Sequence, residues 1–211
     1  MIQTMNILAI GAHPDDIEYG CAGTLIKYAE RGHHIYLMVL TSGQEGGSSE
    51  IRKQEQENAA ELMSVQKIFW GGYHDTQLPL NKELIEKIEE VIGEVKPDLI
   101  FVNYGDDTHQ DHRILTEATM SATRYVRNVL FFEVPTTQNF NPQVFVDISD
   151  TLERKFQVLE AHASQVKKTN IEDMYIIELA RANATFRGIQ GRVKFAEAFA
   201  PLRLFTVSYT H

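Results

Sequence analysis

Two apolar runs in this sequence each lead into a short cluster of histidine and aspartate, and this feature most limits what the chain can fold into. Residues 5–10 precede the segment Gly11-Ala12-His13-Pro14-Asp15-Asp16, and residues 99–102 precede His109-Gln110-Asp111-His112. Continuous apolar runs of this length are typical of buried strands in a parallel sheet. In open α/β sheets, ligands bind outside the carboxyl ends of the strands. We therefore expect both clusters at one edge of the same sheet.

The rest of the chain alternates between strand-like and helix-like patterns. We expect strands at 5–10, 35–40, 67–70, 99–102, 129–132 and 144–148, and helices at 20–31, 51–63, 82–95, 112–126 and from 149 to 162, with 171–198 mostly helical. Alternation with short connections predicts an α/β fold, a Rossmann-like doubly wound and mainly parallel sheet flanked by helices. Because no repeat or linker interrupts the pattern, residues 1–211 are expected to form one domain.

Composition indicates an ordinary globular protein. The formal net charge is −9, which argues against a broad nucleic-acid surface, although local arginines can still bind an anionic substrate. Cys21 is the only cysteine, so no intramolecular disulfide can form, as fits a reducing compartment. No basic leader and no apolar run of membrane-spanning length is recognised, so we expect a cytoplasmic protein without a membrane span.

The two clusters have the composition of a mononuclear metal site. Catalytic zinc takes three protein ligands and keeps one position open for water, and imidazole and carboxylate groups also accept Fe(II) or Co(II). Pro14 biases the preceding histidine toward an extended backbone, which favours a sharp turn at the strand end. Either cluster alone could be a helix-capping turn, but both together favour a metal. The candidate residues are His13, Asp15, Asp16, His109, Asp111 and His112.

These motifs resemble the PIG-L (LmbE-like) family of zinc-dependent N-acetylglucosamine deacetylases. The family motif A-H-P-D-D-E reads here Ala12-His13-Pro14-Asp15-Asp16-Ile17-Glu18, with the glutamate one position late. The second motif, H-x-D-H, is His109-Gln110-Asp111-His112. Weaker similarities extend through the loop at 41–46, the turn that ends in Asp75, and the late segments around His162 and Arg187.

The resemblance implies a role for each motif residue. It implies that His13, Asp16 and His112 bind zinc and that Asp15 is the general base. It also implies that His109 is an acid or oxyanion stabiliser. Asp111 would then be hydrogen-bonded to the His109 ring and raise its pKa, as a carboxylate partner does. The family also implies a homo-oligomer, a trimer or a hexamer.

The expected activity is metal-dependent removal of an N-acetyl group from an N-acetylated amino sugar, a small-molecule conjugate of the N-acetylglucosamine type. Glu45, Arg52 and Asp75 are the expected substrate-binding residues, although Arg52 and Glu55 could instead form a surface pair within one helix. Two other functions stay open at this stage. One is a metal-dependent hydrolase of another bond, such as a phosphoester, and the other is a noncatalytic Rossmann-like ligand-binding protein.

Overall fold

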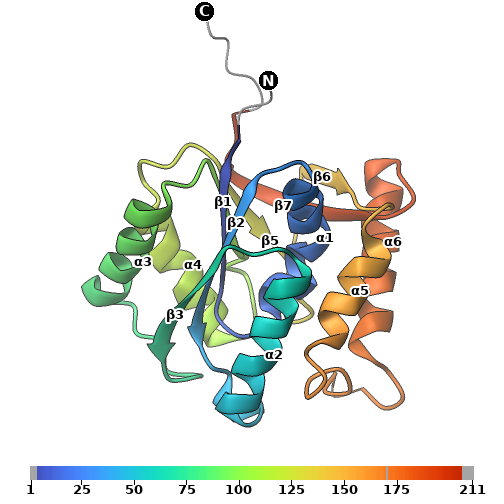
Figure 1. The fold of residues 1–211 in the computed structure, drawn as a ribbon, viewed down its shortest axis with the longest axis horizontal. Coiled ribbons are helices and arrows are strands. Elements are labelled where there is room, and N and C mark those ends of the chain that lie inside the picture. Colours follow the sequence, from blue (N-terminus) through green and yellow to red (C-terminus); the bar gives the residue numbers. More distant parts are fainter. Residues whose placement is uncertain (1–3, 170, 206–211) are drawn as a thin grey trace, which may run out of the picture.

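The computed structural model describes residues 4–169 and 171–205, which form a seven-stranded sheet with helices on both faces (Figure 1). The strand order is β3-β2-β1-β4-β5-β7-β6. The strands are β1 (Asn6–Gly11), β2 (His34–Thr41), β3 (Lys67–Tyr73), β4 (Leu99–Asn103), β5 (Val129–Phe132), β6 (Val144–Asp147) and β7 (Ala196–Arg203). The five strands from β3 to β5 run parallel, and β7 is antiparallel to both of its neighbours. The predicted α/β class is confirmed.

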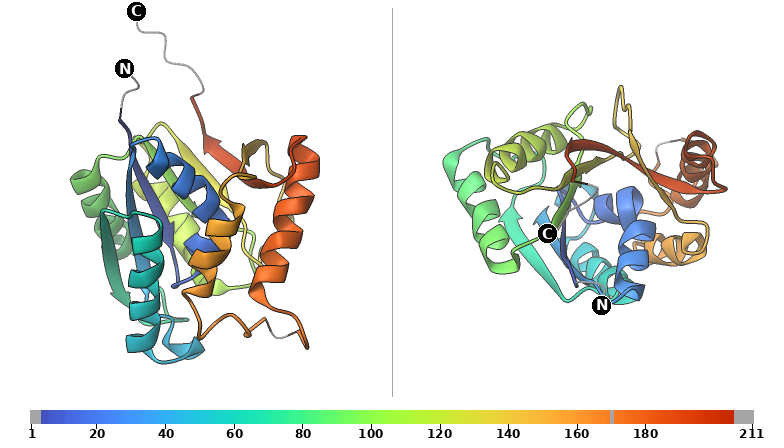
Figure 2. Two further views of the ribbon diagram at one scale, coloured as in Figure 1. Left: turned by 45° about the vertical axis from the view of Figure 1, so that its right-hand side comes forward. Right: turned by 90° about the horizontal axis from the view of Figure 1, so that it is seen from above.

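The helices divide into two layers, one on each face of the sheet (Figure 2). They are α1 (Asp16–Glu30), α2 (Ser49–Leu62), α3 (Lys82–Val95), α4 (Gln110–Ala122), α5 (Leu152–Glu160) and α6 (Ile176–Gly191), with a 3-10 turn η1 (Gln44–Gly46) before α2. Ile7 and Ala9 of β1 pack toward the layer of α1, α2, α5 and α6, whereas Leu8 and Ile10 pack toward α3 and α4. Because both faces of β1 are covered, its sequence is apolar at every position from Ile7 to Ile10 rather than alternating.

Local signals explain where several helices begin. Ser48 accepts a hydrogen bond from Ile51 N at the start of α2, and Asn81 accepts one from Leu84 N at 2.9 Å at the start of α3. Such side-chain caps satisfy amide groups that have no partner inside the helix. Among the described residues, none of the helices combines the length and the apolar character that a membrane crossing requires.

The sequence misplaced several boundaries, and its largest error was at the last strand. Residues 196–198 were predicted to be helical, but they begin β7, which is inserted antiparallel between β5 and β6. The run Ala-Glu-Ala-Phe-Ala has high helical propensity, and tertiary strand pairing overrides it. Helix α1 begins at Asp16 rather than at 20, and α4 spans Gln110–Ala122 rather than 112–126. Arg203 donates to the carbonyl oxygens of Thr123 and Val126 beyond the end of α4.

Candidate active site

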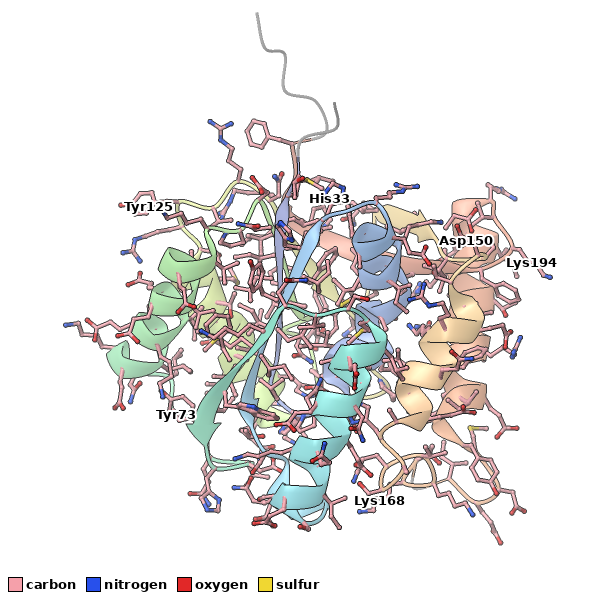
Figure 3. The ribbon with its side chains drawn as sticks, viewed as in Figure 1. His33, Tyr73, Tyr125, Asp150, Lys168 and Lys194 are labelled. Atoms are coloured by element: carbon pink, nitrogen blue, oxygen red, sulfur yellow. The ribbon has the colours of Figure 1, made fainter. Side chains whose placement is uncertain are left out.

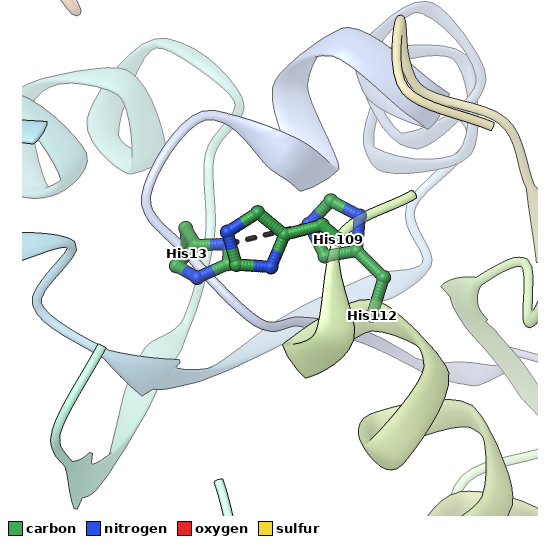
Figure 4. A group of neighbouring side chains, drawn as sticks. All are labelled: His13, His109 and His112. Atoms are coloured by element: carbon green, nitrogen blue, oxygen red, sulfur yellow. Dashed lines mark hydrogen bonds between the residues drawn. The ribbon is translucent and has the colours of Figure 1, made fainter. Parts of the chain in front are cut away.

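Both histidine-aspartate clusters lie at the carboxyl edge of the two central strands, as predicted. His13, Asp15 and Asp16 follow β1 at the start of α1, and His109 and His112 follow β4 at the start of α4. Strands β1 and β4 are paired in parallel, from Ile7↔Leu99 to Ile10↔Val102. This pairing brings together side chains that are almost a hundred residues apart in the sequence (Figure 4).

Three ligand-type atoms form a nearly equilateral triangle at this edge. His13 Nδ1 lies 3.2 Å from His112 Nε2 and 3.4 Å from Asp16 Oδ2. His112 Nε2 lies 3.2 Å from Asp16 Oδ2. All three residues are buried, and all three line the same cavity. The structure therefore brings together the three residues that the resemblance names as metal ligands.

The outer nitrogen of His13 is oriented by two more carboxylates. His13 Nε2 lies 2.9 Å from Asp75 Oδ1 and 3.2 Å from Asp111 Oδ2. Asp111 is fully buried and accepts hydrogen bonds from Thr76 N at 2.7 Å and Leu78 N at 3.3 Å. A carboxylate behind a ligating histidine fixes the ring and its tautomer, and here it directs Nδ1 toward Asp16 and His112.

His112 has an equivalent carboxylate partner in Asp107. His112 Nδ1 lies 3.2 Å from Asp107 Oδ2, close but not aligned as a hydrogen bond. Asp107 is buried and also accepts from His109 N at 2.8 Å. Sequence reasoning missed Asp107, although its position between β4 and His109 is the signal that could have identified it. Asp107 is thus the counterpart of Asp111, one carboxylate behind each imidazole.

The surrounding charges set the pKa values of these groups. Burial disfavours the charged form of His112, but the adjacent carboxylates of Asp16 and Asp107 outweigh it and raise its pKa to about 9. The pKa of His13 is likewise raised against burial, by hydrogen bonds to Asp111, Asp16 and Asp75. Burial opposes ionisation of Asp16 as well, yet the two histidines hold its pKa well below the usual range.

A second grouping shares His13 but is a poorer candidate for the metal. This second grouping is His13, Asp75 and Asp111, whose ligand-type atoms lie within 4.8 Å of one another. The atoms of His13, His109 and His112 also lie within this distance of one another. The carboxylates of Asp75 and Asp111 already accept backbone N–H groups, and Asp111 does not line the cavity. The triangle of His13, Asp16 and His112 faces the cavity, so an ion bound there could contact a substrate.

Asp15 lies beside the triangle in an unusual backbone conformation. Its φ is 91°, in the left-handed region that non-glycine residues rarely occupy. Such strain clusters at functional sites because the surrounding structure must maintain it. Although 31% of its side-chain surface is exposed, burial of the carboxyl raises its pKa to about 6, and the nearby charge of Arg52 opposes this shift. Asp15 lines the cavity, and its carboxylate pairs with Arg52 rather than with His13 or His112.

His109 differs from the predicted arrangement. It caps α4, and its Nδ1 accepts a hydrogen bond from Asp111 N at 3.2 Å. The Asp111 carboxylate contacts His13 instead, because it follows His109 into the helix and points to the other side of the loop. The pKa of His109 is lowered, first by burial and then by the charges of His13 and His112. The expected Asp111–His109 pair and the raised pKa are therefore wrong.

The cap nevertheless gives His109 a defined hydrogen-bonding role. An imidazole whose Nδ1 accepts an N–H group is protonated at Nε2 when neutral. The ring lies close to that of His13, with centroids 4.5 Å apart, and His109 lines the cavity. It is thus a neutral donor that needs no carboxylate partner.

Arg52 positions the two loops that frame the site. Its guanidinium donates to Gly43 O and to Pro14 O, both at 2.7 Å, and lies 3.3 Å from Asp15 Oδ2. Gly43 has a φ of 62°, and a Cβ there would approach Arg52 Nη1 to 2.0 Å, so glycine is required. The alternative surface pair with Glu55 is wrong, because Arg52 is buried and Glu55 accepts from Ser164 instead.

The other two predicted substrate residues differ in how far they are already bonded within the protein. Asp75 lies against His13 through Oδ1 and accepts from Glu45 N through Oδ2 at 3.2 Å, so both of its oxygens are engaged. This arrangement favours orientation of His13 over binding of a sugar hydroxyl. Glu45 is exposed and lines the cavity.

The cavity above the triangle has a volume of about 350 Å³ and two chemically different walls. The charged wall comes from the loops after β1, β2, β3 and β4. The opposite wall comes from α1, from the loop after β5, and from α5 and α6. Sequence reasoning missed this second wall, whose apolar members are Tyr19, Val134, Pro135, Leu159, Ile176 and Leu179.

Comparison with known proteins identifies the family of this chain. The family described as PIG-L: GlcNAc-PI de-N-acetylase matches residues 8–123, a span that contains both motifs. This chain belongs to the PIG-L family. The PIG-L match covers more than half of the chain and ends just after α4, so it includes the whole charged wall but not the apolar one from α5 and α6.

Individual relatives place the chain among PIG-L deacetylases. It is 34% identical over 167 residues to an uncharacterised deacetylase, YaiS, of Escherichia coli K12, covering 75% of this chain and 90% of the relative. It is 27% identical to a probable N-acetyl-alpha-D-glucosaminyl L-malate deacetylase 2 of Bacillus anthracis, covering 81% and 86%. The structure of N,N'-diacetylchitobiose deacetylase from Pyrococcus horikoshii superposes with a TM-score of 0.81 at 25% identity, covering 95% of this chain and 87% of that one.

Proposed function

We propose that this chain is a zinc-dependent hydrolase that removes the acetyl group from an N-acetylated amino sugar of the N-acetylglucosamine type. The observation that carries the proposal is the triangle of His13 Nδ1, His112 Nε2 and Asp16 Oδ2, with sides of 3.2–3.4 Å, beside the carboxylate of Asp15. The names of the relatives support the substrate class, because N-acetylglucosamine units occur in both substrates while the attached group differs.

The triangle fits a tetrahedral divalent ion. Zinc binds imidazole nitrogen and carboxylate oxygen at about 2.0–2.2 Å, which places neighbouring ligand atoms of a tetrahedron about 3.3–3.5 Å apart. The observed separations fall close to this range, and the donor set of two imidazoles and one carboxylate also suits Fe(II) or Co(II). A bound ion of this kind supplies Lewis-acid polarisation of a carbonyl and acidification of water.

Asp15 is the group that accepts the proton of the attacking water. It lines the cavity next to Asp16 and is positioned by Arg52, which donates to the preceding carbonyl of Pro14. As the oxygen of water bonds to the amide carbon, its proton passes to the Asp15 carboxylate. When the carbon–nitrogen bond breaks, that proton can pass to the leaving amine, which yields acetate and the free amino sugar.

His109 is placed to stabilise the negative charge that develops on the amide oxygen. Its Nε2–H is fixed as a donor by the N-cap interaction at Nδ1. A donor aimed at a developing oxyanion contributes about 10²–10³ in rate in comparable enzymes. This role does not need the raised pKa predicted from the sequence, because the His109 ring donates from Nε2 in its neutral form.

The test is acetate release from a panel of N-acetylglucosamine conjugates, with and without a chelator and with metal added back. Asp15→Asn should retain metal and lose at least about 100-fold in kcat, whereas the matched variant Asp16→Asn should lose both metal and activity. Stoichiometric metal without acetate release from any conjugate would contradict the proposal and favour a binding protein. The cytoplasmic location and the trimer or hexamer stay predictions, testable by fractionation and light scattering.

A further inference from the structure

The turn that follows β3 holds a threonine in a backbone conformation that threonine rarely adopts. Gln77 N donates to His74 O at 3.1 Å, which closes a four-residue turn with Thr76 at its third position. The φ of Thr76 is 66°. A turn with a positive φ at this position, such as type II, favours glycine or asparagine there. A residue branched at Cβ is a genuine outlier in this region, so the turn is strained at Thr76.

Thr76 differs from the other non-glycine residues that have a positive φ in the described part of the chain. Three of them lie at or just after the end of a helix, where the left-handed conformation is common: Ser64, Lys96 and Arg192. The other three are aspartate or asparagine, which tolerate this conformation better than most residues: Asp15, Asn139 and Asp173. Thr76 is the only β-branched residue in this group, and neither explanation applies to it.

The backbone of Thr76 has a clear role, but this role does not need the side chain. Thr76 N donates to Asp111 Oδ2 at 2.7 Å, and Thr76 O accepts from Gln110 Nε2 at 3.4 Å. These two bonds attach the turn to the start of α4 and hold the carboxylate that orients His13. Glycine would provide the same N–H and C=O groups without the strain. The support of Asp111 therefore explains the positive φ, but it does not explain a threonine.

Thr76 is exposed and lines the active-site cavity, as His109 does. Figure 3 shows Tyr73 of β3 and Lys168, which also lines the cavity, in the lower part of the view, where the parallel strands end. Within the part of the chain that the structure describes, the hydrogen bonds of Thr76 involve only its backbone. Its hydroxyl is therefore available to a ligand. A threonine hydroxyl both donates and accepts hydrogen bonds, and so it suits a sugar hydroxyl, which does the same.

We propose that Thr76 is a substrate-binding residue whose hydroxyl forms a hydrogen bond with a hydroxyl group of the amino-sugar ring. The proposal rests on the proposed deacetylase function, because it assigns a substrate contact to that same site. Strained residues persist where the surrounding structure maintains them, and they cluster at functional sites. The neighbouring Asp75 has both of its oxygens engaged with His13 and Glu45 N. Thr76 thus offers a free polar group at the point where the Asp75 carboxylate is already bonded.

Three variants of the full chain separate the hydroxyl from the strain. Thr76→Val keeps the branched shape without the hydroxyl, Thr76→Ser keeps the hydroxyl, and Thr76→Gly removes the hydroxyl and the strain. On the conjugate that the wild type deacetylates fastest, the valine and glycine variants should lower kcat/KM about three- to tenfold, mainly through KM, and the serine variant should stay within about twofold. Because all three keep the N–H group that binds Asp111, metal content should not change. Unchanged kcat/KM in Thr76→Val, or a loss that falls on kcat and metal content, would overturn the contact.

Thermal unfolding of the same variants tests whether the side chain is kept at the expense of stability. Thr76→Gly should raise Tm by about 2–4 °C while it lowers kcat/KM, because glycine adopts a positive φ without a Cβ. The matched control is Ser64→Gly, since Ser64 is exposed, has a φ of 59° and lies outside the cavity. This control should also raise Tm, but it should leave kcat and KM unchanged. A lower Tm in Thr76→Gly than in the wild type would overturn the argument from strain.

The two proposals fail in different ways. If the wild type releases acetate and Thr76→Val does so with the same kcat/KM, the deacetylase function stands and the contact is wrong. If no conjugate releases acetate, the function is wrong, and calorimetric titration of N-acetylglucosamine into the wild type and Thr76→Val decides about the contact. Weaker binding by the variant would then support it, and equal or undetectable binding would overturn it.

Discussion

A buried ion pair between Lys155 and Glu197 offers the sharpest test of how the fold supports the site. Lys155 Nζ lies 2.6 Å from Glu197 Oε1, and only 4% and 3% of the two side chains are exposed. Glu197 also accepts from Gly23 N at 2.9 Å and Thr24 N at 2.7 Å, and Lys155 donates to Tyr19 O. The pair thus joins α5 and β7 to α1, the helix whose first turn carries the site.

Removing one member should cost several kcal/mol, because the other charge is left buried. Breaking a buried pair in this way typically costs about 3–5 kcal/mol. Lys155→Met leaves Glu197 with two backbone donors, which places the expected loss in the free energy of unfolding near about 3 kcal/mol. Glu197→Gln leaves the buried ammonium with only neutral acceptors, so its loss should be larger, about 4 kcal/mol. The double variant leaves no uncompensated charge and should cost at least about 2 kcal/mol less than the sum.

Urea unfolding of the wild type, both single variants and the double variant measures this coupling. For a chain of this size, a loss of about 3 kcal/mol corresponds to a decrease in Tm of roughly 6–12 °C. Arg181→Met is a control, because its contact with Glu153 is exposed and should be worth at most about 1 kcal/mol. The reasoning fails if the single-variant losses add without coupling, or if each is as small as that of the control.

Three further predictions concern other parts of the site and its support. Gly20→Ala should destabilise the fold by about 1–3 kcal/mol or more in urea unfolding, because a Cβ there would lie 2.1 Å from the buried ring of Phe132. Burial raises the pKa of the Cys21 thiol, so at pH 8 the thiolate should be scarce and a thiol reagent should label the chain only after unfolding. Asp111→Asn should lower metal affinity about 10–100-fold in a chelator competition because His13 loses one of its two orienting carboxylates, and unchanged affinity would contradict that role.

Those parts of the fold that depend on local patterns could be predicted from the sequence. The helix Lys82–Val95 and the strand Val129–Phe132 match their predicted bounds, since Pro97 and the amphipathic pattern mark one and a short apolar run marks the other. The meeting of the two motifs was also predictable, because parallel strands bring their carboxyl ends to one edge. Both inferences need only periodicity and topology.

The roles of the carboxylates behind the two imidazoles could not be predicted, because they depend on the direction of each side chain in three dimensions. Asp111 and His109 are two residues apart, so the sequence suggests a pair, but the start of α4 turns one toward Asp75 and the other toward the cavity. Asp107 lies in the loop between β4 and α4, where no helix or strand pattern in the sequence marks it. The apolar wall is contributed by α5 and α6, whose packing over the site depends on β7, the strand that the sequence failed to identify.

Three carboxylates support the triangle of His13, Asp16 and His112 from behind its imidazoles, without belonging to the triangle themselves. Asp75, Asp107 and Asp111 surround the two imidazoles, and burial is outweighed at each so that its pKa is lowered. Each also accepts a backbone N–H group, and these donors belong to the loops that form the cavity wall. Ionised carboxylates in such a place need positive partners. The same three acids therefore fix the loops, orient the imidazoles and supply the negative field that favours a divalent cation at the triangle.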